Sequence, residues 1–249
     1  VAVYAIGSQI NNYYLQFSSA ISGVFVPQVN RIVASNESEI KKNKQLTDVF
    51  TRVGRVQFII LMLILTGFIF LGKYFVLKWA GEGYDNAYYV ALLLITPATI
   101  PLIQNIGIEI QRAKNMHQFR SYIYLGMAVL NIVISIFLAM RWGEIGAALG
   151  TTISLVVANG IIMNWFYHKK IGIDIIYFWK QIGEFLPALI LPIIVGVVLN
   201  IRPTTNLIGF AVRVVVYSLV YCLSFYFLGL NDFEKEQIRK IMRKLRIVK

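Results

Sequence analysis

The feature that most constrains this chain is a series of long blocks that contain no acidic, basic or histidine residue. Seven such blocks occur, at 1–30, 56–72, 86–108, 121–140, 145–167, 185–201 and 214–230. A helix needs about 20 apolar residues to cross the hydrocarbon of a bilayer, and about 17–25 are observed. Five blocks fit directly, the second extends toward Val76 if Lys73 snorkels, and the last begins near Leu207 with Arg213 inside it. The sequence therefore predicts an all-α, polytopic membrane helical bundle with about seven transmembrane helices.

Composition agrees with a membrane protein. Hydrophobic residues make up 57% of the 249 residues and charged residues 14%, against about 45–50% and about 25% in an ordinary soluble domain. The lone cysteine, Cys222, lies inside a hydrophobic block, so the chain can form neither an internal disulfide framework nor a cysteine-ligated metal site.

The formal net charge of +12 could indicate nucleic acid, an anionic membrane surface or membrane topology. The positions of the basic residues decide among these. Alternate loops carry six of them at 31–55, three at 112–120, three at 169–180 and seven from 235 onward, whereas the opposite side has only Lys73, Lys78, Arg141 and Arg202. Basic loops stay in the cytoplasm. We therefore expect a cytoplasmic C-terminus and no nucleic-acid partner.

Seven crossings with the tail inside place Val1 on the outer face. An exported N-terminus without a signal sequence is unusual, so we expect an odd number of further helices upstream. The final segment, 231–249, reads as a basic amphipathic helix on anionic membrane lipids, with Asn231 as N-cap and Glu234 three residues on. A partner-binding or simply solvated tail is the alternative.

Polar side chains within spans are the sharpest functional pointers, because lipid gives them no partner. In the first block, polar residues recur in steps of four, four and three, which places them on one helix face: Ser8, Asn12, Gln16 and Ser19. Such a face fits the wall of a water-filled, carbohydrate-compatible cavity. The alternative is interhelical hydrogen bonding.

The third block combines two prolines with polar residues at its cytoplasmic end. Pro97 and Pro101 each remove a backbone donor, so we expect a kink or hinge there. Downstream lie candidate cavity-lining amides and a candidate ion or headgroup contact: Gln104, Asn105, Glu109 and Arg112. Glu109 could bind a coupling proton or sodium ion, or could be an interfacial carboxylate neutralised by Arg112.

Three further polar positions within spans are candidates. Asn131 and Asn159, with Asn164, could join the same polar interior, although a single asparagine is often packing glue. Arg213 lies about one and a half turns inside the last span, where it could contact an anionic headgroup such as a diphosphate or snorkel to the outer surface.

Signatures of enzymes are mostly absent. His117 and His168 are isolated, and no GxSxG, HExxH, CxxC or phosphate-binding P-loop occurs. We expect no catalytic residue, no metal and no cofactor.

Two passages resemble the oligosaccharide flippases of the multidrug/oligosaccharidyl-lipid/polysaccharide exporter superfamily. One, YAIGSQINNYYLQFSSAISGVFVPQVNRIVAS, is similar to that family's helix ending in a proline before a basic loop, with Pro27 and Arg31 in place. The other, RWGEIGAALGTTISLVVANG, is similar to the family's Gly-x-x-Gly-Ala-Ala start of the last helix of a six-helix lobe. With IPLIQNIGIEIQRAKN, the resemblance covers most of the chain.

The resemblance implies the second lobe of such a fold without its first helix at 1–167, two extra helices at 168–230 and the basic tail at 231–249. It implies a flippase in the bacterial inner membrane that moves an undecaprenyl-diphosphate-linked oligosaccharide outward by alternating access, completed by a missing N-terminal half. A multidrug exporter of the same fold, a membrane polysaccharide polymerase or ligase, and a seven-helix receptor are the alternatives. A polymerase or ligase would need a long outer loop, and the outer loops expected here are short.

Overall fold

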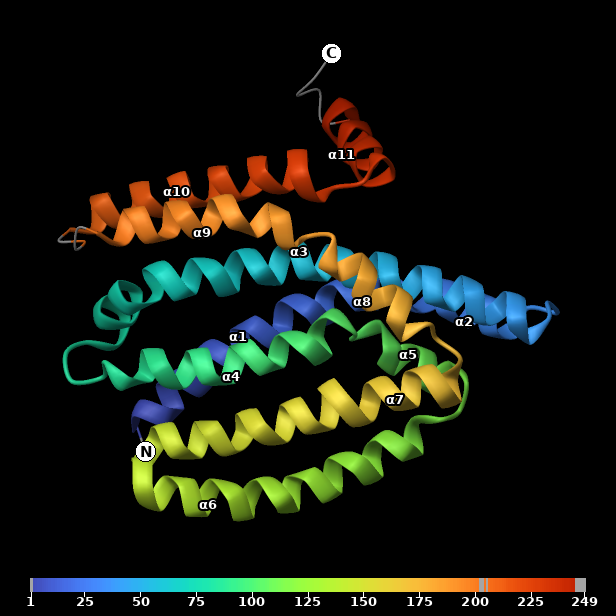
Figure 1. Cartoon of the computed structure of the whole chain (residues 1–249), viewed down its shortest axis with the longest axis horizontal. Helices are drawn as coiled ribbons and strands as arrows, with labels where there is room; N and C mark the ends of the chain where they lie inside the picture. Colours follow the sequence, from blue (N-terminus) through green and yellow to red (C-terminus); the bar gives the residue numbers. More distant parts are fainter. Residues whose placement is uncertain (1, 202–203, 205, 245–249) are drawn as a thin grey trace. The chain divides into compact units, whose positions relative to one another are not determined.

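All regular structure in residues 2–201, 204 and 206–244, which the computed structural model describes, is helical (Figure 1). The chain divides into two compact units, Val1–Lys180 and Gln181–Lys249. Residues 168–180, which the sequence analysis grouped with the two extra helices, thus belong to the first unit.

The first unit contains α1 to α7, two π-helical segments and most of α8. Its first six helices are α1 (Ala2–Gly23), α2 (Val26–Ala34), α3 (Glu39–Ala80), α4 (Asn86–Ile103), α5 (Ile106–Ala113) and α6 (His117–Leu155). The chain continues through η1 (Val156–Met163), α7 (Asn164–Phe166), η2 (Tyr167–Ile171) and α8 (Ile175–Gly183).

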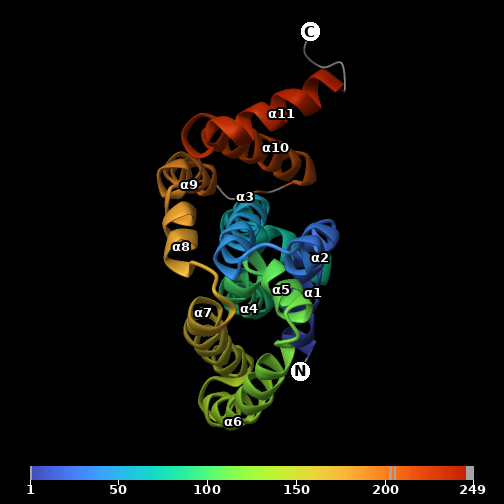
Figure 2. The same cartoon turned by 90° about the vertical axis from the view of Figure 1, so that its right-hand side faces the viewer.

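Helix α4 is the centre of this unit. Ten of its eighteen residues are buried, because α1, α3, α6 and η1 all pack against it (Figure 2). At Gly7 the α1 backbone lies so close to α4 that an added Cβ would come 2.6 Å from Val90 Cγ1. A residue without a side chain is therefore what permits this close helix pair.

Helix α6 reverses direction partway along its length. Trp142 and Gly143 depart from helical geometry, and Gly143 has a φ of +56°, which favours glycine. Figure 1 shows the two halves running back along each other from this turn. The predicted boundary between the blocks 121–140 and 145–167 thus coincides with a tight helical hairpin.

Four helices are long and apolar enough to cross a bilayer, judged by length and composition within the described residues. They are α3, α4, the continuous stretch His117–Ile171 and Leu207–Gly229. The bent pair α8 and α9 (Leu186–Asn200) adds a fifth if it forms one span. A membrane location fits these helices.

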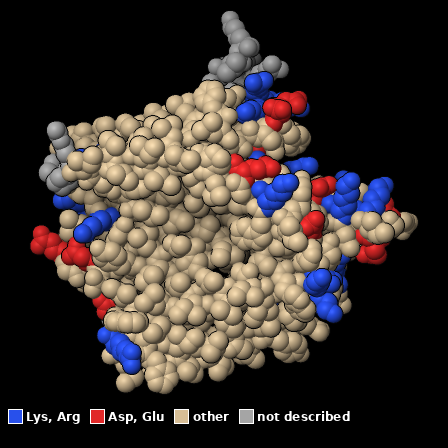
Figure 3. Space-filling model, in the orientation of Figure 1, with Lys and Arg blue, Asp and Glu red and all other residues tan. Residues whose placement is uncertain are grey.

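Charged side chains of the first unit gather at its two ends, and the face between them in Figure 3 is uncharged. At one end Lys114 donates to Asn43 Oδ1 and to the Ile171 carbonyl, which joins three basic loops. At the other end Asn86 donates to Glu144 across 3.0 Å. The three basic segments of the first unit, 31–55, 112–120 and 169–180, therefore lie at one end of it.

The second unit consists of α9, α10 (Leu207–Ser224), η3 (Phe225–Gly229), α11 (Asp232–Lys244) and the last residues of α8. The predicted capping box of the tail helix is present. Asn231 Oδ1 accepts from the Glu234 amide at 2.8 Å, and Glu234 accepts from the Asn231 amide at 3.0 Å. The predicted continuation of this amphipathic helix over 245–249 lies outside the described residues.

Three predicted spans differ from the observed helices. The first predicted block, 1–30, is broken after Gly23. A second helix, α2, begins at Val26, and Pro27 lies in its first turn, where proline favours a helix start. The third ends at Ile103 instead of 108, with a break at Gln104 and Asn105. Helix α3 is longer than predicted, since its charged first half continues the same helix from Glu39.

Candidate functional site

Helix α1 carries two polar faces with different surroundings. The predicted stripe is largely uncovered: Asn12, Gln16 and Ser19 are exposed and Ser8 is half-buried. Within the first unit, no other described helix covers this face. Whether this face lines a cavity stays a prediction. The amides of Asn12 and Gln16 are not buried by packing among the described residues of the first unit.

The opposite face of α1 is buried against α3 and α4 by hydrogen bonds. The Tyr14 hydroxyl lies 2.8 Å from Thr99 Oγ1, and Ser18 donates to the Leu102 carbonyl across 2.8 Å. From α3, Gln57 Nε2 donates to Ser18 Oγ at 3.1 Å and to Ser22 Oγ at 2.7 Å.

Sequence reasoning missed this buried face. Gln57 is an amide one residue into a charge-free block, and the criterion applied to the first block would have identified it. Its Oε1 is buried without a partner among the described residues, which raises the cost of desolvating it.

Two predicted lining amides lie instead in a cluster between α4, α6, η1 and α7. Gln104 donates to Asn164 Oδ1 at 2.9 Å, and Trp179 donates to the same oxygen at 2.8 Å. Asn159 Oδ1 accepts from Tyr124 at 2.6 Å. Gln104 and Asn159 are almost fully buried, so in this structure they hold helices together.

The remaining predicted residues are separate. Asn105 is half-buried at the α4–α5 break, and Asn131 accepts from Ser135 within the α6 hairpin. Arg112 and Glu109 form an ion pair at 2.8 Å, as one of the two predicted readings of Glu109 requires. In the second unit Arg213 donates to Thr204 Oγ1 at 2.6 Å. Within the first unit, the structure does not bring Asn105, Asn131 and the Glu109–Arg112 pair to one site.

The predicted hinge residues Pro97 and Pro101 lie within a continuous helix. Pro97 has no N–H to pair with the Leu93 carbonyl four residues back, and Thr152 of α6 donates to that carbonyl at 2.6 Å. The second unit repeats this arrangement: Pro192 cannot pair with the Ala188 carbonyl, and Ser224 donates to it at 2.7 Å. Neighbouring hydroxyls thus satisfy carbonyls that lipid could not.

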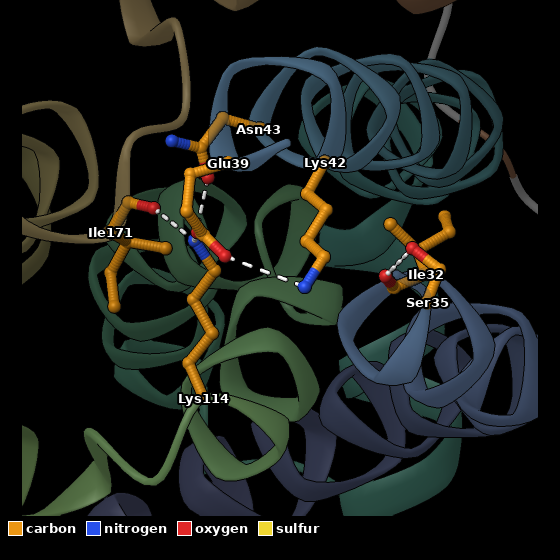
Figure 4. A network of polar contacts seen from close by, with 7 residues as sticks. All are labelled: Ile32, Ser35, Glu39, Lys42, Asn43, Lys114 and Ile171. Atoms are coloured by element: carbon orange, nitrogen blue, oxygen red, sulfur yellow. Dashed lines mark hydrogen bonds and ion pairs between the residues drawn. The ribbon is translucent and has the colours of Figure 1, made fainter. Parts of the chain in front are cut away.

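The basic end of the first unit is tied together by Lys114 (Figure 4). Its Nζ lies 2.6 Å from Asn43 Oδ1, 2.8 Å from the Ile171 carbonyl and 4.0 Å from Glu39. Glu39 also pairs with Lys42 at 3.4 Å. Burial lowers the pKa of Lys114, Glu39 partly opposes this shift, and Lys42 adds to it.

Metal chemistry has no site in the part of the chain that the structure describes, because no group of three His, Cys, Asp or Glu side chains is suitably placed. Comparison with protein-family models, curated proteins and solved structures found no match to this chain. The function must therefore be argued from the helices themselves.

The exposed face of α1 can bind a ligand through neutral hydrogen bonds and ring contacts. Beside the amide face, one residue further along the chain from Asn12 and Gln16 and so about 100° round the helix, lie Tyr13 and Phe17, each 51% exposed. These rings line a hollow of about 240 Å³ together with aromatic residues of α3, namely Phe68, Phe75 and Trp79. Amides pair with hydroxyl groups, and aromatic rings pack on apolar ring faces or chains.

Proposed function

We propose that this chain is part of a membrane transporter that flips a lipid-linked oligosaccharide across the bacterial cytoplasmic membrane for cell-surface polysaccharide synthesis. The substrate class is an undecaprenyl-diphosphate-linked sugar chain, moved by alternating access. The basic end of the first unit would face the cytoplasm, where its charges meet anionic lipids.

The uncharged polar face of α1 is the observation that carries this proposal. Asn12 and Gln16 are exposed on a helix whose opposite face packs into an apolar bundle. Exposed amides are costly against lipid, so such a face is expected to meet water or a polar ligand. A carbohydrate offers many neutral hydroxyls, which amides can both donate to and accept from.

Seven crossings belong to the same proposal. The count follows if the turn at Gly143 separates two spans, if α8 and α9 form one span, and if α1 crosses as well. Helix α1 has 22 residues, which is enough for a crossing. Because of its polar face it is not among the four helices that are apolar enough to cross a bilayer by composition.

A multidrug exporter of the same fold is the second candidate, and the aromatic hollow beside α1 favours it. Phe75 and Trp79 stack there at 5.8 Å, a surface suited to a lipophilic cation or neutral drug. The two candidates differ in which α1 residues matter. A glycolipid depends on the amides, whereas a drug depends on the rings.

The test is translocation of a lipid-linked oligosaccharide by the complete transporter in cells lacking the native activity. Asn12→Leu with Gln16→Leu should lower translocation at least about tenfold, since two hydrogen-bonding groups are lost, while membrane insertion stays normal. Asn12→Gln with Gln16→Asn keeps both amides and is the matched control. Unchanged translocation in the leucine double variant would remove the amide face of α1 from the proposal. No translocation by the unaltered protein, together with efflux of a lipophilic cation that depends on Tyr13 and Phe17, would favour the exporter.

A further inference from the structure

The aromatic hollow beside α1 is an open groove that runs along the helices. On α3 its lining extends from Ile64 to Trp79, which at about 1.5 Å per residue is about 22 Å of helix. It is open to its surroundings, since Phe75 and Trp79 are 40% and 46% exposed. The hydrocarbon core of a bilayer is about 30 Å thick. The hollow therefore has the length to receive an extended chain that lies parallel to the helices.

The lining of the hollow is almost entirely apolar. The described residues that form it include no charged side chain and no amide. Tyr14 belongs to the lining, but its hydroxyl is engaged within the bundle, 2.8 Å from Thr99 Oγ1 and 3.3 Å from the Leu61 carbonyl oxygen. Such a surface offers little to water or to sugar hydroxyls. A hydrocarbon chain is the ligand whose chemistry it matches.

A positive charge stands at the end of the hollow that is farthest from the basic loops. Lys78 is exposed and directly precedes Trp79, and its Nζ lies 5.8 Å from the ring centroid of Tyr74. At about 100° per residue, Lys78 is about 70° round α3 from the middle of the lining, whereas Lys73 is about 150° away. Lys78 therefore borders the hollow, and Lys73 lies on the far side of the same helix.

An apolar surface alone does not select a ligand in a bilayer, because lipid tails are as apolar as the hollow. A ligand is preferred there only if it adds packing contacts or a charge. A polyprenyl chain has a methyl branch and a double bond in each isoprene unit, so it brings more carbon atoms against the aromatic rings than a straight acyl chain does. Its phosphate adds an anion, for which a lysine is a suitable partner.

We propose that the aromatic hollow holds the polyprenyl chain of the transported glycolipid, with the phosphate at Lys78. This rests on the proposed function and gives two faces of α1 different tasks, because the amides meet the sugar and the rings meet the chain. Lys78 lies at the end opposite the basic loops, which the proposed function places at the outer surface. The hollow therefore holds the glycolipid in the outer leaflet, before its release.

Fluorescence of Trp79 in the 249-residue chain in lipid nanodiscs tests this directly. Trp142, Trp165 and Trp179 are replaced by phenylalanine, and the nanodiscs contain phosphatidylcholine with brominated acyl chains, which quench the remaining tryptophan. Undecaprenyl phosphate should displace the brominated chains and restore the emission. Phosphatidic acid, which has a phosphate but straight chains, should need an at least about fivefold higher concentration. A chain with Trp165 as its sole tryptophan corrects for dilution of the quencher.

Variants of α3 locate the two parts of the ligand. Lys78→Gln should raise the concentration of undecaprenyl phosphate needed for half displacement about fivefold, and Lys73→Gln is the matched control on the far side of the helix. Undecaprenol, which has no phosphate, should act equally on wild type and Lys78→Gln. Phe75→Ala should weaken displacement by both probes, whereas Phe137→Ala, which removes an exposed ring from α6, should not.

The inference is wrong if undecaprenyl phosphate leaves Trp79 quenched, or if phosphatidic acid acts equally well, since the hollow would then hold ordinary lipid. Equal effects of Lys78→Gln and Lys73→Gln would overturn the placement of the phosphate. Restored emission with tetraphenylphosphonium but not with undecaprenyl phosphate would assign the hollow to a drug. Displacement as expected, combined with unaffected translocation in the Asn12 and Gln16 variant, would overturn the amide face of the proposed function alone.

Discussion

At the scale of single residues, buried polar side chains decide how the helices of the first unit dock. Gln57 connects α3 to two serines of α1, and Tyr14 and Ser18 connect α1 to α4. Each such bond inside a membrane protein contributes about 0.6–2 kcal/mol. Their directionality fixes the rotation of α1, which apolar contacts alone would leave loosely defined.

Replacing Gln57 tests this. Gln57→Leu should destabilise the chain by about 1–2 kcal/mol, because the bonds from its amide to the Ser18 carbonyl, Ser18 Oγ and Ser22 Oγ are lost while one unpaired oxygen is also removed. The measurement is unfolding in mixed micelles with increasing sodium dodecyl sulfate. Thr66→Val is the control, since among the described residues Thr66 bonds to Met62 of its own helix, and it should change stability by less than about 0.5 kcal/mol. A larger loss in the control would refute the assignment.

The partly buried Lys114 should make the free energy of unfolding depend on pH. Its folded pKa is lowered from the ordinary 10.5, chiefly by burial. Between these two pKa values the unfolded chain binds more protons than the folded chain, so stability from this group rises with pH and levels off above 10.5.

The melting temperature of wild type minus that of Lys114→Met should therefore increase as the pH rises toward 10.5 and level off above it. Lys170→Met, which removes an exposed lysine from the neighbouring loop, controls for the loss of one positive charge. A difference that stays flat or falls with pH would show that burial of Lys114 is not the dominant effect.

At the scale of elements, proline-containing helices in both units depend on a hydroxyl from a neighbouring helix. Thr152 serves the carbonyl that Pro97 leaves unpaired, and Ser224 serves the one left by Pro192. The expected hinge at Pro97 and Pro101 therefore appears as an intact helix that breaks only at Gln104. At Pro97 the α6 contact supplies the donor that the α4 backbone lacks.

Thr152→Val should consequently destabilise the chain by about 1–3 kcal/mol by leaving the Leu93 carbonyl unpaired in an apolar region. Thr151→Val, one residue away and bonded only to its own helix, should have a small effect. In the Pro97→Ala background the restored amide can pair with Leu93, so the cost of Thr152→Val should shrink by more than half. Additive effects in this double-mutant cycle would contradict the arrangement.

At the scale of the whole molecule, the charge pattern predicts sidedness. In a Cys222→Ser background, cysteines at Lys41 and Lys170 should react with a membrane-impermeant maleimide from one side of the membrane. Cysteines at Gly83 and Trp142, in the turns at the opposite end, should react only from the other side. Labelling of the cysteines at positions 41 and 170 from opposite sides would refute both the predicted membrane topology and the transporter proposal.

The sequence by itself determined the helical class, the positions of the long apolar helices and the grouping of the basic segments at one end of the first unit. It could do so because hydrocarbon requires long uncharged helices and because basic loops are retained on one side. That Asn12 and Gln16 share one face of α1 was also predictable, since it depends only on helical periodicity.

Only the tertiary structure decided how the polar residues are used. Gln104 and Asn159 have the same amide group as Asn12, yet they are buried and hydrogen-bonded to Asn164 and Tyr124. Likewise, no local signal reveals that Thr152 completes the α4 ladder or that Ser154 is left unpaired. An amide or hydroxyl in a membrane must find a partner, and which partner it finds depends on residues distant in sequence that packing brings within about 3 Å.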